Sequence, residues 1–230
     1  DCLGVPGGSA LPGTACNDTN PCTTNDTWTA GCLCVGSAIV APAISSATSN
    51  SPVCVGQSLN LTASATGQGT IIYGWTGPNG FTSSAQNPSI SGVSSVAAGT
   101  YVLTVSNGCG TATQNVSVSI NAAPSATISY VGSPLCTSAS PVSVNRTGTS
   151  GGTYSASPSG LSISSSTGTI TPGSSNAGTY TVTYTIAAAG GCAQVQTTAS
   201  VTITSAPSAT ISYAGSPFCT SISPVSANRT

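Results

Sequence analysis

One segment of this chain occurs twice. Residues 124–147 read PSATISYVGSPLCTSASPVSVNRT, and residues 207–230 match them at 20 of 24 positions, with four exchanges of one apolar residue for another. The two copies begin about 83 residues apart, whereas solenoid repeats are about 20–50 residues long, so this period is typical of a small complete domain. The chain is therefore predicted to contain tandem domains of one kind.

Apolar and polar residues alternate with a period of two in several segments. The clearest are residues 58–65, 100–107, 114–121, 179–186 and 198–205. These segments are rich in Val, Ile, Thr and Tyr, they are punctuated by Gly, Asn and Pro, and no stretch has a helical pattern. Short alternating strands at this spacing are typical of β-sandwiches. We therefore expect an all-β protein.

The cysteines reveal an earlier copy of the same domain. The motif SPVC ends at Cys54 and SNGC ends at Cys109, whereas SPLC ends at Cys136 and AGGC ends at Cys192. The separation of the two cysteines in the first copy differs by a single position from that in the second. We therefore predict two homologous sandwiches, each closed by one disulfide, Cys54–Cys109 or Cys136–Cys192. The sandwiches are expected at residues 53–121 and 124–205.

The last copy of the repeat, residues 207–230, contains the tenth cysteine, Cys219. By the same spacing its partner is expected about 56 residues later, beyond Thr230. These residues are therefore predicted to be the first strands of a further, truncated sandwich. An alternative prediction is that they complete the sandwich of a neighbouring chain by strand donation.

Residues 1–40 differ in kind from the rest of the chain. Their five cysteines stand among Gly, Pro, Asn and Asp: Cys2, Cys16, Cys22, Cys32 and Cys34. With few apolar residues to bury, this Cys-rich module is expected to keep its shape through disulfides. Because five is an odd number, at least one cysteine is free or pairs outside the module, with another domain or chain. Residues 41–52 are predicted to be a linker into the first sandwich.

Charged residues are almost absent, at 2% of the chain against about 25% in an ordinary soluble domain. Ser and Thr make up a third of the sequence, and N-x-[ST] sequons occur at Asn17, Asn25, Asn60, Asn115, Asn145 and Asn228. Hydroxyls hydrate a surface and also accept sugars. We predict a coat of covalent glycans, mainly O-linked, as the solubilising element. Burial of the surface against other subunits is the alternative, and the two are compatible.

The scarcity of ionisable groups also excludes most kinds of chemistry. The chain has no Lys, Glu or His, and its carboxylate side chains are those of Asp1, Asp18 and Asp26. Acid–base catalysis and nucleophile activation need such groups, so we expect no enzyme activity and no organic cofactor. Two arginines cannot build a nucleic-acid surface, and no apolar run approaches the roughly 20 residues of a membrane span. Ten cysteines without histidine favour disulfides and hence an extracellular location.

One cluster of oxygen ligands stands out in the Cys-rich module. Its members lie close together in the sequence: Asn17, Asp18, Asn20, Asn25 and Asp26. Calcium takes six to eight oxygens, so these residues could form a weak site of the kind found in extracellular modules. The competing interpretation is that Asn and Asp cap turns between disulfides, and we favour it. Thr19 and Thr27, in two Asp-Thr pairs, could instead carry sugars.

Aromatic residues and arginines receive mainly structural interpretations. Trp75 follows Cys54 as the core tryptophan follows the first cysteine of an immunoglobulin (Ig) sandwich, so core packing is favoured over sugar stacking. Trp28 is the better candidate for an interface. Two tyrosines, Tyr101 and Tyr180, follow Ala-Gly-Thr at matching positions and are predicted to form structural corners. The arginines of the two NRT motifs, Arg146 and Arg229, bond either backbone carbonyls or a neighbouring module.

These segments resemble parts of very large secreted surface proteins of gliding and biofilm-forming bacteria. The segments DCLGVPGGSALPGTAC and NPCTTNDTWTAGCLCVG are similar to a Cys-rich module of those proteins. The stretch from CVGQSLNLTASA to GTATQNVSVSI is similar to their tandem Ig-like or PKD-like repeats. The resemblance implies Ig-like β-sandwiches, a dedicated secretion route, and roles in adhesion, matrix or surface filaments. The chain departs from the usual module in having CNDTN where CDDGN is expected.

Together these features predict a structural protein. We expect a subunit of an extracellular, glycosylated fibre on a bacterial surface or in its matrix, which self-associates and carries sugars. The alternative is the stalk of a large secreted adhesin whose ligand-binding domain lies outside this chain.

Overall fold

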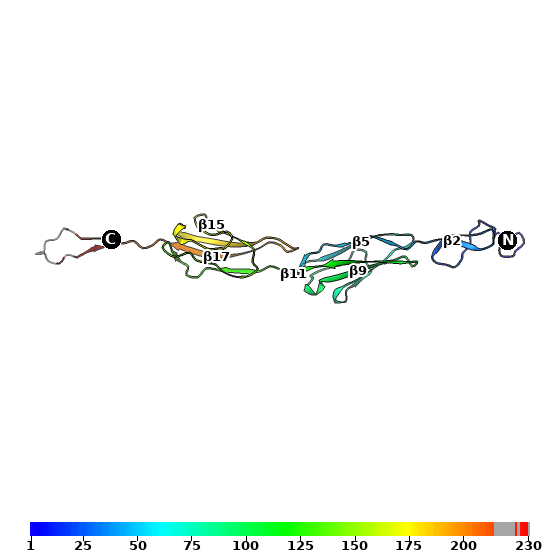
Figure 1. Cartoon of the computed structure of the whole chain (residues 1–230), viewed down its shortest axis with the longest axis horizontal. Helices are drawn as coiled ribbons and strands as arrows, with labels where there is room; N and C mark the ends of the chain where they lie inside the picture. Colours follow the sequence, from blue (N-terminus) through cyan, green and yellow to red (C-terminus); the bar gives the residue numbers. More distant parts are fainter. Residues whose placement is uncertain (214–223, 225, 230) are drawn as a thin grey trace. The chain divides into compact units, whose positions relative to one another are not determined.

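The computed structural model describes residues 1–213, 224 and 226–229, and its regular structure is almost entirely β (Figure 1). The chain divides into two compact units. The first comprises Asp1–Ala123 with Ala188–Ala193, and the second comprises Pro124–Ala187 with Gln194–Thr230. The all-β class expected from the alternating segments is confirmed.

The Cys-rich module contains one antiparallel pair of strands, β1 (Thr23–Trp28) and β2 (Cys34–Ala38), with an irregularity between Thr24 and Thr27. Of its residues only Ala10 is buried. Two disulfides cross-link the module internally, Cys2–Cys32 and Cys16–Cys34. Because so little apolar surface is buried, loop closure by these disulfides is what holds the module in shape.

The first sandwich combines two sheets. One sheet has the order β3 (Ala43–Ser49), β5 (Leu59–Thr66), β8 (Ser89–Ile90). The other has the order β10 (Thr111–Val118), β9 (Gly99–Ser106), β6 (Ile72–Thr76), β7 (Thr82–Ser83). A short parallel pair joins β4 (Val53–Cys54) to β11 (Ile120–Asn121), and two 3-10 turns complete the fold, η1 (Pro78–Gly80) and η2 (Ser95–Ala97).

The core of this sandwich lies between its two sheets. Alternate residues of β5 and β9 point inward: Leu59, Leu61 and Ala63 from β5, and Tyr101, Leu103 and Val105 from β9. Trp75 of β6 is 1% exposed and its Nε1 donates a hydrogen bond to Gln86 O at 3.1 Å. The prediction that Trp75 belongs to the core is therefore confirmed.

The predicted linker, residues 41–52, is wrong over most of its length. It contains β3, which pairs with β5 along its whole length and contributes the buried Ala47 to the core. Ile44 also packs against this core, beside an irregularity between Ile44 and Ser46 that shifts the register. The strand is rich in Ser and Ala and carries few large apolar residues, so its alternation is weak in the sequence.

The second sandwich repeats the plan. Its larger sheet has the order β13 (Leu135–Cys136), β17 (Val195–Thr204), β16 (Gly178–Ile186), β15 (Thr153–Ser157). A smaller sheet pairs β12 (Ala126–Ser129) with β14 (Asn145–Gly148), and η3 spans Pro172–Ser174. Its core includes Tyr184, Val182 and Val201, which alternate with exposed or half-buried polar residues along β16 and β17.

Both predicted tyrosine corners are confirmed. Tyr101 donates its hydroxyl to Ala97 O at 3.0 Å, and Tyr180 donates its hydroxyl to Asn176 O at 2.9 Å, each four residues upstream. Arg146 bonds backbone carbonyls, donating from Nη1 to Gly148 O and Thr149 O at 3.1 and 2.9 Å. Its guanidinium also lies 5.7 Å from the ring centre of Tyr184, within range of a cation–π interaction.

The last strands repeat the smaller sheet of the second sandwich. β18 (Ile211–Ser212) pairs with β19 (Asn228–Arg229), matching Ile211 with Arg229 just as Ile128 of β12 is matched with Arg146 of β14. Residues 207–230 therefore begin the same fold again in the part that the structure describes. Cys219 lies outside the described residues, and whether the segment is truncated or donated stays a prediction.

Candidate functional site: disulfide joints at the hairpin tips

The disulfides do not close the sandwiches as the spacing predicted. Cys54 is bonded to Cys192, and Cys109 is bonded to Cys22 of the Cys-rich module. The predicted pairs Cys54–Cys109 and Cys136–Cys192 are therefore wrong. The expectation that an odd cysteine of the module is free or pairs outside it resolves to Cys22, which pairs outside.

Strand length explains the correction. Cys109 lies in the β9–β10 turn, whereas Cys54 lies in β4 beside β11, at the far end of the eight-residue β10. Eight residues of strand span about 27 Å, while a disulfide needs Cα atoms within about 7 Å. Likewise Cys192 lies in the β16–β17 turn, and the ten residues of β17 separate it from Cys136 by about 33 Å.

Cys136 is the one cysteine without a disulfide among those that the structure describes. The sequence predicts a disulfide between Cys136 and Cys192, but Cys192 is bonded to Cys54. The other predicted disulfide cysteines are all bonded.

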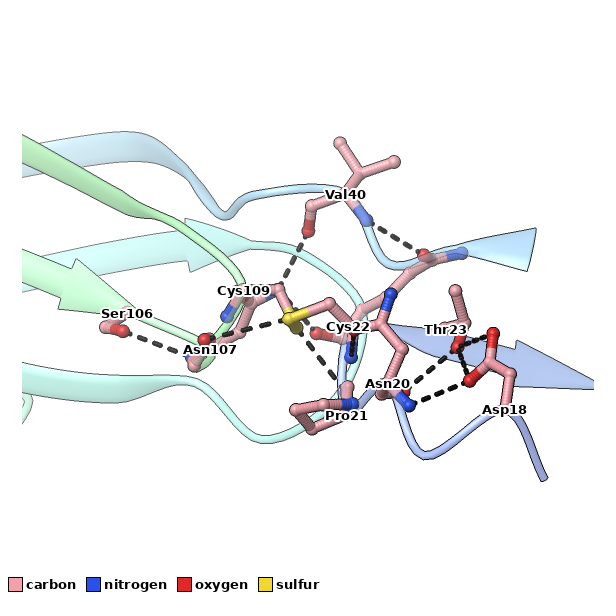
Figure 2. The surroundings of a disulfide bond; sticks show 11 residues. Asp18, Asn20, Pro21, Cys22, Thr23, Val40, Ser106, Asn107 and Cys109 are labelled. Atoms are coloured by element: carbon pink, nitrogen blue, oxygen red, sulfur yellow. Dashed lines mark hydrogen bonds between the residues drawn. A yellow bond between two sulfur atoms is a disulfide. The ribbon is translucent and has the colours of Figure 1, made fainter. Parts of the chain in front are cut away.

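Figure 2 shows the first joint, in which the tip of the β9–β10 hairpin meets the Cys-rich module. The Cα atoms of Cys22 and Cys109 are 5.3 Å apart. Each sulfur also lies against a backbone carbonyl of the other segment: Cys109 Sγ is 3.6 Å from Pro21 O, and Cys22 Sγ is 3.8 Å from Gly108 O. The two segments are thus in close contact around the bond.

Asn107 and Gly108 shape the tip of the β9–β10 hairpin, which carries Cys109. Gly108 has a φ of 82°, a left-handed conformation that a side chain would strain. The Asn107 side chain accepts the Cys109 N–H at 3.1 Å and donates to Val40 O at 2.8 Å and Gln68 O at 3.0 Å. This one amide therefore orders the cysteine and ties the tip to two neighbouring segments (Figure 2).

The segment of the Cys-rich module that carries Cys22 is also ordered by hydrogen bonds. The Cys22 N–H donates to Asn20 Oδ1 at 3.0 Å, and Cys22 O accepts the Ile39 N–H at 2.8 Å. Asp18 Oδ1 accepts the Asn20 N–H at 2.8 Å and the Thr23 hydroxyl at 2.9 Å (Figure 2). Consecutive side-chain caps thus fix the backbone that presents Cys22.

The second joint lies within the first unit, between β4 and the turn Ala188–Ala193. The Cα atoms of Cys54 and Cys192 are 4.8 Å apart. Gly190 and Gly191 form the turn with φ values of 56° and 78°, as a two-residue type I′ hairpin requires. Asn121 Nδ2 donates to Gly190 O at 2.8 Å, and a Cβ on Gly191 would overlap Pro52 O. The turn needs glycine both for its conformation and for this close approach.

The candidate calcium ligands are used mainly as turn caps. Asn17 Oδ1 accepts the Thr19 N–H, Asp18 and Asn20 cap Asn20 and Cys22, and Asp26 Oδ2 accepts the Asp18 N–H at 3.3 Å. Asp26 Oδ1 is buried without a hydrogen-bond partner. Among the described residues no group of three His, Cys, Asp or Glu is placed to hold a metal ion. The hydrogen bonds of Asn17, Asp18 and Asn20 are those of turn caps, so they support the capping interpretation.

We expect Asp18→Ala to destabilise the segment around Cys22 by about 1–2 kcal/mol, because two hydrogen bonds to a carboxylate are lost. Hydrogen exchange of the Asn20 and Cys22 amides should rise by about 5–30-fold. The loss should be equal in millimolar calcium and in EDTA, and Asp18→Asn, which keeps an acceptor oxygen, should be nearly neutral. Calcium-dependent protection of the wild type that Asp18→Asn abolishes would instead establish a metal site.

Most of the candidate sugar acceptors lie at the surface. Most predicted sequon asparagines are exposed: Asn17, Asn25, Asn60, Asn115 and Asn145. The backbone of Asn228 lies in β19. Asn60 Oδ1 accepts the Ser89 hydroxyl at 2.7 Å. Thr19 is exposed and Thr27 is half-buried. These positions leave the glycan prediction open to test.

The hollow beside the second joint offers no acid–base chemistry. It has a volume of about 280 Å³ and a lining without ionisable side chains: Asn50, Pro52, Val53, Gln57, Ser58 and Gly191. Burial raises the pKa of Tyr101, Tyr130 and Tyr154, so these phenols remain neutral. Tyr130, for example, donates its hydroxyl to Gly168 O at 2.7 Å. Tyr101 and Tyr130 therefore act as structural hydrogen-bond donors.

In the part of the chain that the structure describes, no helix has the length and apolarity to cross a membrane. No protein-family model matches the chain, and no curated protein matches it.

Solved structures of tandem immunoglobulin domains do resemble the chain. An I-band fragment of titin aligns with a TM-score of 0.50 and 12% identity, over 79% of this chain and 81% of that one. Sidekick-1 immunoglobulin domains 1–5 align with a TM-score of 0.46 and 15% identity, over 77% of this chain and 41% of that one. The chain thus spans two fifths of that structure, and 49% of a four-domain Sidekick-1 structure. At these identities the likeness to titin shows the fold alone: the chain is built of tandem immunoglobulin-like β-sandwiches.

Proposed function

We propose that this chain is a load-bearing structural segment of an extracellular, glycosylated fibre on a bacterial surface or in its matrix. The observation that carries the proposal is the placement of the two disulfides that are not internal to the Cys-rich module, Cys22–Cys109 and Cys54–Cys192. Both lie at sandwich ends, where a hairpin tip is bonded to another segment, and neither closes the core of a sandwich. Bonds in these positions cross-link successive parts of a chain against extension.

The Cys54–Cys192 bond has a topological consequence for a chain under tension. It joins residues separated by 138 positions, so the covalent path from one end to the other bypasses everything between them. Most of both sandwiches lies in that bypassed stretch. Force applied to the ends therefore cannot extend them while the bond is intact. This property suits a fibre or a stalk and has no evident use in an enzyme.

The outer face of the second sandwich supports the glycan part of the proposal. Cross-strand neighbours on β15, β16 and β17 are hydroxyl residues, in the rows Ser155–Thr183–Thr198 and Ser157–Thr181–Ser200. These residues are exposed or half-buried, and no charged residue interrupts the rows. Such a face offers many acceptors for O-linked sugars. The near absence of charge makes a hydrated coat the natural means of keeping such faces apart.

Two experiments test the proposal on the protein as it is secreted by the cells that produce it. Electron microscopy before and after deglycosylation should show filaments, which thicken or bundle when the sugars are removed. Intact-mass measurement should give a mass well above that of the bare polypeptide, which for this chain is 22.0 kDa. Dispersed monomers of unmodified mass that bind a soluble ligand would overturn the fibre.

The resemblance to the tandem repeats of large secreted bacterial surface proteins supports a second candidate, the stalk of a large secreted adhesin. The same bypassed path would protect a stalk under load. The two candidates differ in what micrographs show: a stalk ends in a separate binding domain and does not polymerise. Removal of that domain would abolish adhesion without changing the sandwiches.

A further inference from the structure

Cys136 occupies the same structural position in the second sandwich as Cys54 does in the first. Each is the second residue of a two-residue strand, β13 or β4, that follows a Ser-Pro pair. Each strand forms a parallel pair with another strand of its sandwich. Cys54 of β4 is matched with Asn121 of β11, and Cys136 of β13 is matched with Thr204 of β17. The two cysteines therefore occupy equivalent sites in homologous folds.

The backbone around the two cysteines is also equivalent. In the first sandwich the Val55 N–H donates to Asn121 O at 2.9 Å, and in the second the Thr137 N–H donates to Thr204 O at 2.9 Å. Cys54 O and Cys136 O each accept an N–H from the residue three positions later, at 3.0 and 2.9 Å. The surface that receives a hairpin tip at Cys54 is thus reproduced at Cys136.

The two disulfides that are not internal to the Cys-rich module show which kind of segment bonds to a cysteine in the position of Cys54. Cys54 receives Cys192, and Cys22, which follows Pro21, receives Cys109. Both donating cysteines sit in the turn of the last hairpin of a sandwich, directly after a glycine with positive φ. Two disulfides are not internal to the Cys-rich module, and in each of them the cysteine of a Gly-Cys hairpin tip is bonded to a cysteine near a proline.

We propose that Cys136 is the receiving half of a third joint, which forms a disulfide with the Gly-Cys hairpin tip of another sandwich of this kind. Pro134 takes the place of Pro52 beneath the incoming turn. Thr204, whose hydroxyl donates to Leu135 O at 3.4 Å, takes the place of Asn121. The inference concerns connection between sandwiches and does not depend on the fibre or its glycans.

The chemistry is thiol–disulfide exchange with an oxidised donor, such as a disulfide oxidoreductase or glutathione disulfide. The Cys136 thiolate attacks the donor disulfide and releases one donor thiolate, and the hairpin-tip thiolate then attacks Cys136 Sγ and releases the second. Two protein thiols are oxidised to a disulfide, and the donor disulfide is reduced to two thiols, which take up the two protons that the protein thiols lose. Ser138 Oγ lies 3.1 Å from Cys136 Sγ, and hydrogen bonding from Ser138 lowers the pKa of Cys136, which favours the attacking thiolate.

The test uses the chain itself to supply a free hairpin tip. Cys54→Ala releases Cys192, and Cys219→Ala ensures that the cysteine outside the described residues cannot compete. In a buffer of reduced and oxidised glutathione, this double variant should form chains linked between Cys136 of one molecule and Cys192 of another. Non-reducing electrophoresis and mass spectrometry of the cross-linked peptide identify the bond. Circular dichroism shows whether the sandwiches stay folded.

The matched control moves the thiol by two residues to an exposed neighbour, with Cys136→Ser and Ser138→Cys in the same background. If the site recognises the tip, Cys136 should cross-link to Cys192 at least about tenfold more than the displaced thiol, a difference worth about 1.4 kcal/mol. Equal cross-linking at both positions, or a Cys136 that stays fully alkylatable, would overturn the proposal. Failure of this joint would leave the fibre proposal standing, because that rests on the two joints already formed.

Discussion

Replacing Trp75 with alanine is expected to destabilise the first sandwich by about 3–5 kcal/mol, the cost of emptying a large buried site. Trp75 is 1% exposed and lies in the core that β5, β6 and β9 share. Its loss would also leave Gln86 O without the indole N–H that it accepts. Because domains of this size are stable by about 5–15 kcal/mol, this single change should remove a large share of the total. Urea unfolding followed by circular dichroism measures the effect.

Two variants on the same strand and at the same site sharpen this test. Ile72→Ala lies on β6 with a side chain 61% exposed, so it should change stability by less than about 0.5 kcal/mol. Trp75→Phe keeps an aromatic ring but loses the hydrogen bond to Gln86. Its loss of stability should therefore lie between those of Ile72→Ala and Trp75→Ala. If Trp75→Ala were as mild as Ile72→Ala, the tryptophan would not be a core residue and an exposed, sugar-stacking role would regain support.

The strands of the sandwiches could be predicted because their alternation is the direct result of packing between two sheets. Along β9, Tyr101, Leu103 and Val105 are fully buried while the residues between them are exposed or half-buried. The break between β10 and β11 could not be read in this way. Residues 114–121 keep one alternating pattern, although Ile120 and Asn121 leave β9 and pair with β4.

The disulfide pairs could not be predicted from spacing alone. Equal spacing shows that two cysteines occupy equivalent positions in homologous domains, and it does not show that they are close together. The length of the strand between two cysteines decides whether they can pair, and β10 carries the chain from one end of the sandwich to the other. Glycine directly before Cys109 and Cys192 was the available signal, because it marks both cysteines as parts of a tight turn.

The candidate site in the Cys-rich module illustrates a different limit. Asn17, Asp18 and Asn20 were recognised as a cluster of oxygen ligands, and turn capping was the favoured interpretation. Their local hydrogen bonds support it. The contact of this loop with the β9–β10 tip was invisible in the sequence, because it joins Cys22 to a residue 87 positions away. Contacts of that range depend on how the sandwich ends are arranged.

Pulling the oxidised chain by its two ends should give a final length far shorter than that of the reduced chain. The Cys54–Cys192 bond alone bypasses 138 positions, which at full extension of about 3.3–3.6 Å per residue correspond to roughly 450–500 Å. The internal disulfides of the Cys-rich module withhold a further, smaller length. Single-molecule force spectroscopy with and without a reducing agent measures the difference. Oxidised and reduced chains of equal final length would show that the joint does not form.

Two serine variants distinguish joints at the hairpin tips from disulfides that close each sandwich on itself. With the joints, the tensioned path runs along the chain to Cys54 and then crosses directly to Cys192, so Cys109 lies off this path. Cys109→Ser should therefore leave the length of the oxidised chain unchanged. Cys54→Ser should lengthen it by at least roughly 170 Å, because a bond that shields 138 positions is lost and one that shields 87 remains.

Closure of each sandwich by its own disulfide predicts a different pair of results. Cys54 and Cys109 would then be partners, so either substitution would break the same bond. Both variants would lengthen the oxidised chain equally, by about 180–200 Å. The comparison does not depend on the disulfides inside the Cys-rich module, because Cys109→Ser leaves all of these in place. An oxidised Cys109→Ser chain as short as the wild type, beside a longer Cys54→Ser chain, is thus the result that the joints predict and that closure of each sandwich on itself excludes.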